Sequence, residues 1–406
     1  MAGDRSGGSG EESIEAAPPV GKGLRSTSAR LAPFGSTIFS DITSRALATG
    51  AINLGQGFPN FDGPEFVKEA AIAAIRAGHG QYAPSSGVPE LTQAIASRFA
   101  TATGRSGIDP GEHVTVTSGC TEALAATFVG LLEPGDGVIL IEPTYDAYPV
   151  GVALADAVPS YVTLRPPGFE LTDADLEAAV KDRSRAIVVN SPHNPTGRVF
   201  RRAELEAIAR LCLRHDLFAI TDEVYEHMVF DGAHISLAGL PGMWDRTVTL
   251  SSLGKTFSLT GWKIGWAVAP AELTAGVRAA HQFLTFATAT PLQHAAAAAL
   301  RAPRDYFEEL ARSYRRKRDL LAAGLEEIGL EVFLPEGTYF MMADHSHFGR
   351  GDDVAFVNHL IDRVGVAAIP PSAFYHDKAE AKDLVRFAFC KDEATLREAI
   401  ERLRRL

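Results

Sequence analysis

The amino-acid sequence predicts an α/β protein with a mostly parallel central sheet, followed by a smaller α+β C-terminal domain. Between about residues 114 and 270, short apolar runs alternate with longer helical patterns, which is typical of βαβ units. Several runs are continuously apolar, and this indicates strands that are buried on both faces. After about residue 297 the pattern changes to a long charged helix and then short strands mixed with helices.

Six strands are expected in the larger part of the chain. In order they are Val114–Thr117, Val138–Ile141, Ala186–Val189, Phe218–Thr221, Thr247–Leu250 and Ile264–Val268. Helical patterns lie between them, for example at Thr121–Leu132 and Arg202–His215. Because open α/β sheets bind ligands beyond the carboxyl ends of their strands, these ends are where a functional site is expected.

The smaller part is expected to begin with a linking helix at about Arg304–Ile328. Further short elements follow it: strands near Glu331–Phe333, Tyr339–Ala343, Val366–Ile369 and Val385–Phe389, and helices near Asp352–Val364 and Glu393–Leu403. The expected division is a disordered tail at 1–25, an N-terminal segment at 26–62 that packs with the small domain, a large domain at 63–296 and a small domain at 297–406. The tail is rich in Gly, Ser, Glu and Pro and has no apolar stretch of the kind found in secretory signals.

Composition describes an ordinary soluble protein, with 46% hydrophobic and 22% charged residues. A net charge of -11 disfavours nucleic acid or an anionic membrane as partner, and no stretch approaches the roughly 18 apolar residues of a membrane helix. The three cysteines, Cys120, Cys212 and Cys390, are widely spaced. They fit neither a disulfide framework nor a metal site, so a cytoplasmic location and no metal are expected.

The most informative segment is SSLGKTFSLTGWKIGW at residues 251–266. Lys255 follows an apolar strand directly and is poorly placed to be a solvated charge. Lys263 comes eight residues later, beside Gly261 and Gly265, which let backbone approach closely. An amine that can lose its proton, a cation for an anion and hydroxyls between them suggest a phosphorylated aldehyde. Pyridoxal phosphate (PLP) is such a molecule, and PLP enzymes hold it as a lysine Schiff base.

Other strand ends add groups that suit the same ligand. Ser118-Gly119-Cys120-Thr121 opens a helix, whose N–H groups and dipole favour an anion. Tyr145 offers an aromatic face, Asn194 an amide, Asp222 a carboxylate and Tyr225 a phenol. Each has an ordinary alternative as a cap, a turn residue or a core aromatic. A shared ligand explains better why all of them follow successive strands.

Four motifs resemble, in order and spacing, the class I and II aminotransferases of PLP fold type I: Asn194–Gly197, Asp222–Tyr225, Ser252–Lys255 and Gly261–Gly265. The resemblance extends from about Arg30 to the C-terminus. Three further segments most resemble the kynurenine, glutamine and methionine aminotransferases, with the succinyl-diaminopimelate aminotransferases similarly close: LGQGFP at 54–59, Ser191–Asn194 and VRFAFCK at 385–391.

The resemblance implies a role for each of these side chains. Lys255 forms the Schiff base and moves the proton, Asp222 pairs with the ring nitrogen, and Asn194 and Tyr225 bond the ring oxygen. Tyr145 stacks on the ring, and the helix start with Ser252 and Lys263 binds the phosphate. The implied catalytic residues are Lys255, Asp222 and Tyr225. The implied cofactor-binding set is Gly119, Cys120, Thr121, Tyr145, Asn194, Asp222, Tyr225, Ser252, Lys255, Lys263 and Tyr82. At the position of Lys263 the family more often has arginine, whose fork lysine lacks.

Arg386 is the expected anchor for the substrate. It lies inside the apolar run Val385–Phe389, where a charge is costly unless it is paired. An arginine fork matches a carboxylate, and the resemblance implies that Arg386 binds the substrate α-carboxylate together with Gly57 and Asn194. A structural ion pair is the alternative.

Two further regions concern the neighbouring subunit and specificity. Tyr82 matches a tyrosine that reaches the phosphate of the partner subunit in this family, which implies a homodimer. The segment at 281–290 is expected to approach the substrate side chain and holds no arginine, which disfavours a dedicated aspartate enzyme. Its small Thr288 and Ala289 leave room for a bulkier or polar substrate, and Ile38 and Phe39 are candidates for another wall.

The sequence therefore favours an aminotransferase that acts between a 2-oxo acid and a neutral, sulfur-containing, aromatic or N-acylated amino acid. The alternative is a PLP-dependent β- or γ-elimination or γ-replacement enzyme, because the same Schiff-base chemistry supports both outcomes. A PLP-binding regulator without enzymatic activity is a third hypothesis. The acidic balance and the lack of a preceding DNA-binding segment disfavour it.

Overall fold

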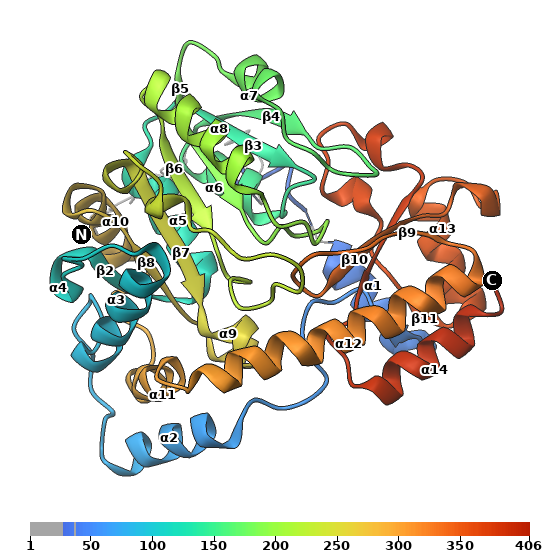
Figure 1. Cartoon of the computed structure of the whole chain (residues 1–406), viewed down its shortest axis with the longest axis horizontal. Coiled ribbons are helices and arrows are strands. Elements are labelled where there is room, and N and C mark those ends of the chain that lie inside the picture. Colours follow the sequence, from blue (N-terminus) through green and yellow to red (C-terminus); the bar gives the residue numbers. More distant parts are fainter. Residues whose placement is uncertain (1–26, 36–37) are drawn as a thin grey trace, which may run out of the picture.

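A seven-stranded sheet forms the centre of the computed structural model, which describes residues 27–35 and 38–406 (Figure 1). Most of the expected tail at 1–25 lies outside the described residues, as residues 1–26 do as a whole. In spatial order the strands are β2 (Val114–Ser118), β8 (Ile264–Val268), β7 (Thr247–Ser252), β6 (Phe218–Asp222), β5 (Ser184–Asn190), β3 (Gly137–Glu142) and β4 (Val158–Thr163). All neighbours are parallel except β8, which is antiparallel to β2 and β7. The predicted α/β fold with a mostly parallel sheet is confirmed.

Strand β4, which pairs with β3 at the edge of the sheet, was not among the predicted strands. This strand contains Pro159 and polar residues, and most of its positions are partly exposed. Proline cannot donate a ladder hydrogen bond and is tolerated at a sheet edge. β4 therefore lacks the continuous apolar run that identified the other six strands of the sheet.

Alternating residues of the central strands enter two different hydrophobic clusters. On β3, Val138 and Leu140 pack with residues of α5 (Gly119–Leu131) and α6 (Ala147–Leu154), whereas Ile139 and Ile141 pack with α8 residues. The continuous apolar runs are thus explained by burial on both faces. The cluster that contains Val138 and Leu140 also includes residues of α10 (Ala271–Leu284). The cluster that contains Ile139 and Ile141 includes residues of α7 (Asp173–Ala179) and α8 (Arg202–Arg214).

A third cluster covers the β2–β8 end of the sheet. Its helices are α2 (Glu65–Arg76), α3 (Pro89–Thr103) and α11 (Thr290–Leu300). The short helix α4 (Pro110–His113) precedes β2, and the short helix α9 (Leu253–Thr256) follows β7. Among the described residues, none of the helices is both long and apolar enough to cross a membrane.

The C-terminal elements gather at the right of Figure 1, together with the N-terminal α1. The long helix α12 (Arg304–Ile328) leads to an antiparallel sheet of β9 (Glu331–Phe333), β10 (Phe340–Asp344) and β12 (Leu384–Ala388). The remaining elements are α1 (Ile38–Thr49), β1 (Ile52–Asn53), β11 (Val366–Ala367), α13 (Asp353–His359) with a π-helical turn at Leu360–Val364, and α14 (Glu393–Leu403). β1 pairs with β11 in parallel, so the N-terminal segment packs onto C-terminal elements.

The strand expected at Val366–Ile369 is shorter than predicted. Regular pairing ends at Ala367, and Ile369 then forms an isolated antiparallel bridge with Arg386. The chain leaves one strand partner and joins another within these four residues. The apolar pattern of residues 366–369 indicates that the whole run is buried, but it does not indicate that the chain changes from one strand partner to another.

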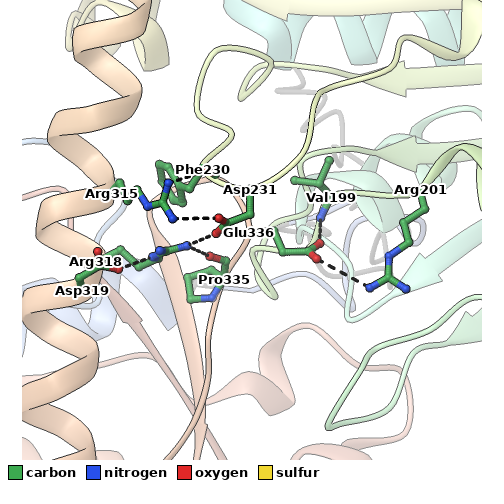
Figure 2. A network of polar contacts seen from close by, with 9 residues as sticks. All are labelled: Val199, Arg201, Phe230, Asp231, Arg315, Arg318, Asp319, Pro335 and Glu336. Carbon is green, nitrogen blue, oxygen red and sulfur yellow. Dashed lines mark hydrogen bonds and ion pairs between the residues drawn. The ribbon is translucent and has the colours of Figure 1, made fainter.

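A polar network joins α12 to the loop that follows β6 and to the segment that precedes β10 (Figure 2). Arg318 donates to Asp231 Oδ2 (2.7 Å) and to the carbonyl of Pro335 (3.0 Å), and Arg315 donates to Asp231 Oδ1 (3.1 Å). Glu336 accepts from the backbone N–H of Val199 (3.1 Å). The network therefore ties the segment before β10 to the helix and to the turn that contains Asn194.

Gly197 brings these segments into direct contact. It has a φ of +72°, and a Cβ there would lie 2.2 Å from Cβ of Pro335. Its carbonyl accepts a 2.7 Å hydrogen bond from the N–H of Gly337. Only glycine satisfies both the conformation and the space, so the Asn194–Gly197 turn is held against the chain that enters β10.

We expect Asp231→Ala to lower the free energy of unfolding by about 1–2 kcal/mol, because two arginines lose their shared acceptor. The side chain of Arg318 is only 4% exposed but that of Asp231 is 47% exposed, so solvent limits the loss. Urea unfolding measures the change. Glu309→Ala, which breaks pairs of Arg312 and Arg316 on the exposed face of the same helix, should leave the unfolding midpoint unchanged. Equal effects of the two variants would contradict this explanation.

Candidate active site

A cavity of about 380 Å³ lies at the carboxyl ends of the strands, within the range of small-molecule sites. It collects nearly all the predicted site residues, from segments spread over the whole chain. Those that line it are Gly57, Gly119, Cys120, Thr121, Tyr145, Asn194, Asp222, Tyr225, Ser252, Lys255, Lys263 and Arg386. Tyr82 is the predicted site residue that does not line it.

Lys255 projects from the short helix α9, directly after β7. Its Nζ lies 5.8 Å from the ring centroid of Tyr225 and 5.9 Å from that of Tyr339. Burial lowers the pKa of Lys255, and the negative charge of Asp222 partly opposes that effect. The side chain is thus an amine near aromatic rings that gives up its proton more readily than an exposed lysine, which makes it a better nucleophile.

An anion cradle forms where α5 begins. A Cβ on Gly265 would lie 2.6 Å from the backbone nitrogen of Cys120, so only glycine lets β8 approach the helix start this closely. Lys263 places its Nζ 3.5 Å from Thr121 Oγ1. Free N–H groups at a helix start and a nearby ammonium are suited to a phosphate.

Asp222 ends β6 and is buried. Its Oδ2 accepts a hydrogen bond from the hydroxyl of Tyr148 (2.8 Å) and its Oδ1 accepts from the N–H of Val224 (3.3 Å). Burial raises the pKa of Asp222, whereas Tyr148, Val224 and Lys255 lower it. The carboxylate can pair with a protonated ring nitrogen of a ligand in the cavity.

Asn190, at the end of β5, joins two parts of the site. Its amide donates to the carbonyl of Asp222 (2.8 Å), and its Oδ1 accepts from the N–H of Asn194 (2.7 Å). The carboxylate and the amide-bearing turn are therefore fixed relative to each other by one side chain.

Arg386, on β12, is 1% exposed and lies among the rings of Phe340 and Phe374. It donates to Asn194 Oδ1 (3.1 Å) and to the carbonyl of Gly55 (2.7 Å), and its Nε has no hydrogen-bond partner. Burial lowers its pKa to about 10, so it stays charged at neutral pH. Within residues 27–35 and 38–406 no carboxylate forms an ion pair with it, and the structural ion pair considered above therefore lacks a partner. A ligand carboxylate would supply one.

These groups fit pyridoxal phosphate. The amine of Lys255, the carboxylate of Asp222 and the cradle beside Lys263 match the aldehyde, the ring nitrogen and the phosphate of that molecule. Tyr145 offers an aromatic face in the same cavity. The unpartnered Nε of Arg386 leaves a place for a second, carboxylate-bearing molecule.

Tyr82 lies on the surface, 86% exposed, with its ring edge-on to Phe286 at 5.5 Å between centroids. A shallow pocket there is lined by residues 80–82 and 287–291, which include Thr288 and Ala289. Within one subunit this region is not part of the cavity. Of the two residues considered as another wall, Phe39 lines the cavity and Ile38 packs against the core of the C-terminal elements.

Sequence reasoning missed several cavity residues, including Tyr148, Asn190, Asp146, Gln56 and Phe340. Tyr148 lies in the first turn of α6, whereas Tyr145 precedes that helix, so no helical spacing between the two indicated Tyr148. Asn190 ends a predicted strand, four residues before Asn194. For Phe340 no local pattern distinguishes a cavity wall from a core aromatic.

A second cavity of about 660 Å³ lies between α3 and β7. Glu223, Glu226 and His234 meet beside it, with ligand atoms within 4.8 Å of one another. Protein groups already bond them: His234 and Ser236 contact Glu223 at 2.8 and 2.9 Å, and Ser251 donates to Glu226 at 3.1 Å. These contacts supply partners for both glutamates, whereas the buried Nδ1 of His234 has no hydrogen-bond partner.

Comparison with known proteins identifies close relatives. Residues 49–403 match the family model described as "Aminotransferase class I and II". The chain is 48% identical over 388 residues to a probable N-succinyldiaminopimelate aminotransferase of Mycobacterium tuberculosis, covering 93% of this chain and 98% of the relative. It is 42% identical over 378 residues to the methionine aminotransferase of Escherichia coli, covering 93% and 97%. The solved N-succinyldiaminopimelate aminotransferase from M. tuberculosis superimposes with a TM-score of 0.91 at 49% identity, covering 93% and 99%.

Replacing Arg386 tests whether its charge is kept for a ligand. Arg386→Met should leave the cofactor-free protein as stable as the wild type or more so, because an unpaired buried charge is removed. Glutarate should raise the thermal midpoint of the wild type but not of the variant. Arg397→Met, which removes an exposed charge, should respond to glutarate as the wild type does. A variant at position 386 that keeps the full response would contradict this role.

Proposed function

The chain belongs to the class I and II aminotransferases, which depend on pyridoxal phosphate, and we propose that it performs transamination in the cavity around Lys255. Its amino-group donors would be neutral, sulfur-containing, aromatic or N-acylated amino acids, and its acceptor a 2-oxo acid. One observation carries this proposal: the amine of Lys255 shares a single cavity with the anion cradle and with the guanidinium of Arg386, whose Nε has no hydrogen-bond partner. The aminotransferase names of the close relatives support transamination rather than elimination or replacement.

Lys255 would act first as the covalent anchor and then as the proton carrier. When bound, pyridoxal phosphate supplies an aldehyde for amine exchange and a ring that accepts electrons from the substrate Cα. Because burial lowers the pKa of Lys255, its amine is more readily unprotonated than that of an exposed lysine and could take a proton from Cα. Asp222 would hold the proton on the ring nitrogen, and Asn194 and Tyr225 would bond the ring oxygen.

Phosphate binding would combine backbone and side-chain groups. The N–H groups of Cys120 and Thr121 would bond its oxygens with Ser252, and Lys263 would supply the charge. Lysine is a point charge without the planar fork of arginine. The short approach of Gly265 to the helix start supports this arrangement.

Substrate choice would follow from the charges in the cavity wall. Arg386 would bind the α-carboxylate, with Gly57 and Asn194 beside it. The other cations among the described residues of the wall are Lys255 and Lys263, both assigned to the cofactor above. No cation then remains within one subunit for a distal carboxylate. Names of relatives that act on methionine and on N-succinyldiaminopimelate support a sulfur-containing or N-acylated substrate.

A second copy of the chain would complete the site. Tyr82 is 86% exposed and Phe283 is 85% exposed, so both rings are accessible to a second copy of the chain. In a homodimer, Tyr82 would reach the partner's phosphate, and Thr288 and Ala289 would border the partner's substrate.

We further propose that residues 63–296 and 297–406 form a large and a small domain, with 26–62 packed on the small one. The packing of β1 on β11 supports this division. A cytoplasmic location is supported by Cys120, Cys212 and Cys390, none of which forms a disulfide.

Protein reconstituted with pyridoxal phosphate should absorb near the visible edge, and Lys255→Ala should abolish that band because no Schiff base forms. Lys382→Ala, which changes an exposed lysine, should keep it. Adding methionine, kynurenine or N-succinyldiaminopimelate should convert the wild type to its amino form, and a 2-oxo acid should restore the band. Release of ammonia or a thiol without that conversion would favour elimination instead.

Shared sites predict complementation between two inactive variants. A mixed dimer of Lys255→Ala with Tyr82→Ala contains one site with both native residues, so refolding the two together should recover activity that neither has alone. Size-exclusion chromatography with light scattering checks the dimer. Mixtures without recovery, from proteins that do form mixed dimers, would contradict the assignment of Tyr82.

A further inference from the structure

We propose that Tyr148 is a positioning residue for this reaction, which holds the carboxylate of Asp222 toward the cofactor ring and at the same time supports the ring of Tyr145. The inference rests on the proposed function and assigns a role to a side chain that no sequence motif indicated. Tyr148 is 3% exposed and lines the catalytic cavity from the first turn of α6.

The hydroxyl of Tyr148 makes a shorter hydrogen bond to the carboxylate of Asp222 than the N–H of Val224 does. Tyr148 donates its hydroxyl to Oδ2 at 2.8 Å, while the N–H of Val224 reaches Oδ1 at 3.3 Å. Val224 belongs to the chain that follows Asp222 directly, so it moves with the carboxylate. Tyr148 comes from a different element and fixes the carboxylate relative to the sheet.

The same tyrosine contacts the aromatic wall of the cavity. Its ring lies 5.7 Å from that of Tyr145, at an interplanar angle of 81°, an edge-to-face arrangement that aromatic pairs prefer. Tyr145 lines the cavity. One side chain thus sets the position of two groups that approach the ring of the cofactor, one at its nitrogen and one at its face.

Charge favours this role. Burial raises the pKa of Asp222, and a donor to its oxygens is the main opposing influence. Burial and the charge of Asp222 also raise the pKa of Tyr148, so its hydroxyl remains a donor. The other titratable groups that interact with the charge of Asp222 are Cys120 on α5, Lys255 on α9, Tyr145 before α6 and Tyr225 after β6.

A purely structural role is the competing explanation, since Tyr148 also belongs to the hydrophobic cluster with Phe128 and Val152. Tyr148→Phe separates the two, because it keeps the ring, the packing and the contact with Tyr145 but removes the hydroxyl. If Tyr148 has only a structural role, the variant binds the cofactor as the wild type does. If Tyr148 positions Asp222, the variant binds the cofactor more weakly.

Tyr148→Phe should weaken binding of pyridoxal phosphate by about ten- to a hundredfold, the effect of one hydrogen bond to a charged group. Titration of the cofactor-free protein, followed by the Schiff-base absorbance, measures this without turnover. Loss of a donor also raises the pKa of Asp222, and a neutral Asp222 cannot hold the proton on the ring nitrogen. The midpoint at which acid releases the cofactor should therefore move to higher pH.

The effect of Tyr148→Phe should also be measured in protein that already carries Asp222→Asn. There the hydroxyl has no carboxylate to hold, so adding Tyr148→Phe should change cofactor affinity by less than about twofold. Tyr161→Phe, on edge strand β4 and stacked on His376, removes a hydroxyl outside the cavity and should behave as wild type. If Asp222→Asn itself leaves cofactor binding and absorbance unchanged, the proposed function fails, and this inference fails with it.

If Tyr148→Phe weakens cofactor binding equally in the wild type and in Asp222→Asn, Tyr148 does not position Asp222, and the proposed function is unaffected. A lower thermal midpoint of the cofactor-free Tyr148→Phe protein with normal cofactor affinity would also overturn that role and would mark a packing residue. Weaker binding only when Asp222 is present, with the midpoint of acid release moved upward, is the result that supports positioning.

Discussion

Burial of unpaired charge in one cavity is the constraint on which the rest of this structure depends. Arg386 is buried with an unpartnered Nε, Asp222 is buried with a raised pKa, and burial lowers the pKa of Lys255. Each of these states costs free energy in the cofactor-free protein. A ligand that carries a ring nitrogen, an aldehyde and carboxylate or phosphate groups would relieve all of them. The cavity is therefore prepared electrostatically for such molecules before they bind.

Two parts of the fold keep these charges in place. The parallel strands deliver Asp222 and Lys255 to one edge of the sheet, and Asn190 links the neighbouring strand ends. Arg386 comes from the C-terminal sheet and meets Asn194 because the turn at Gly197 is clamped to the chain that enters β10. The polar network of Asp231 with α12 holds that clamp from outside (Figure 2).

Much of the fold and most of the cavity could be predicted, for identifiable reasons. Strands such as β3 and β5 are buried on both faces and leave continuous apolar runs, whereas the edge strand β4 leaves none. Lys255 and Arg386 could be found because a charge beside or within an apolar run is unusual. Tyr148 and Asn190 act through other residues, and a tyrosine or asparagine near a strand end is common. The placement of Tyr82 depends on a second chain, which no pattern within one subunit describes.

The central claim is that Lys255 holds the cofactor, and it is tested most directly by identifying which lysine becomes attached to it. Burial also lowers the pKa of Lys317 and Lys391, but these side chains contact the ring of Phe61 and the carbonyl of Phe58 and do not line the cavity. Borohydride reduction of the cofactor-loaded protein, followed by mass spectrometry of its peptides, identifies the lysine that holds the cofactor. Labelling of Lys255 alone is predicted. A label on Lys263, Lys317 or Lys391 with Lys255 unmodified would contradict it.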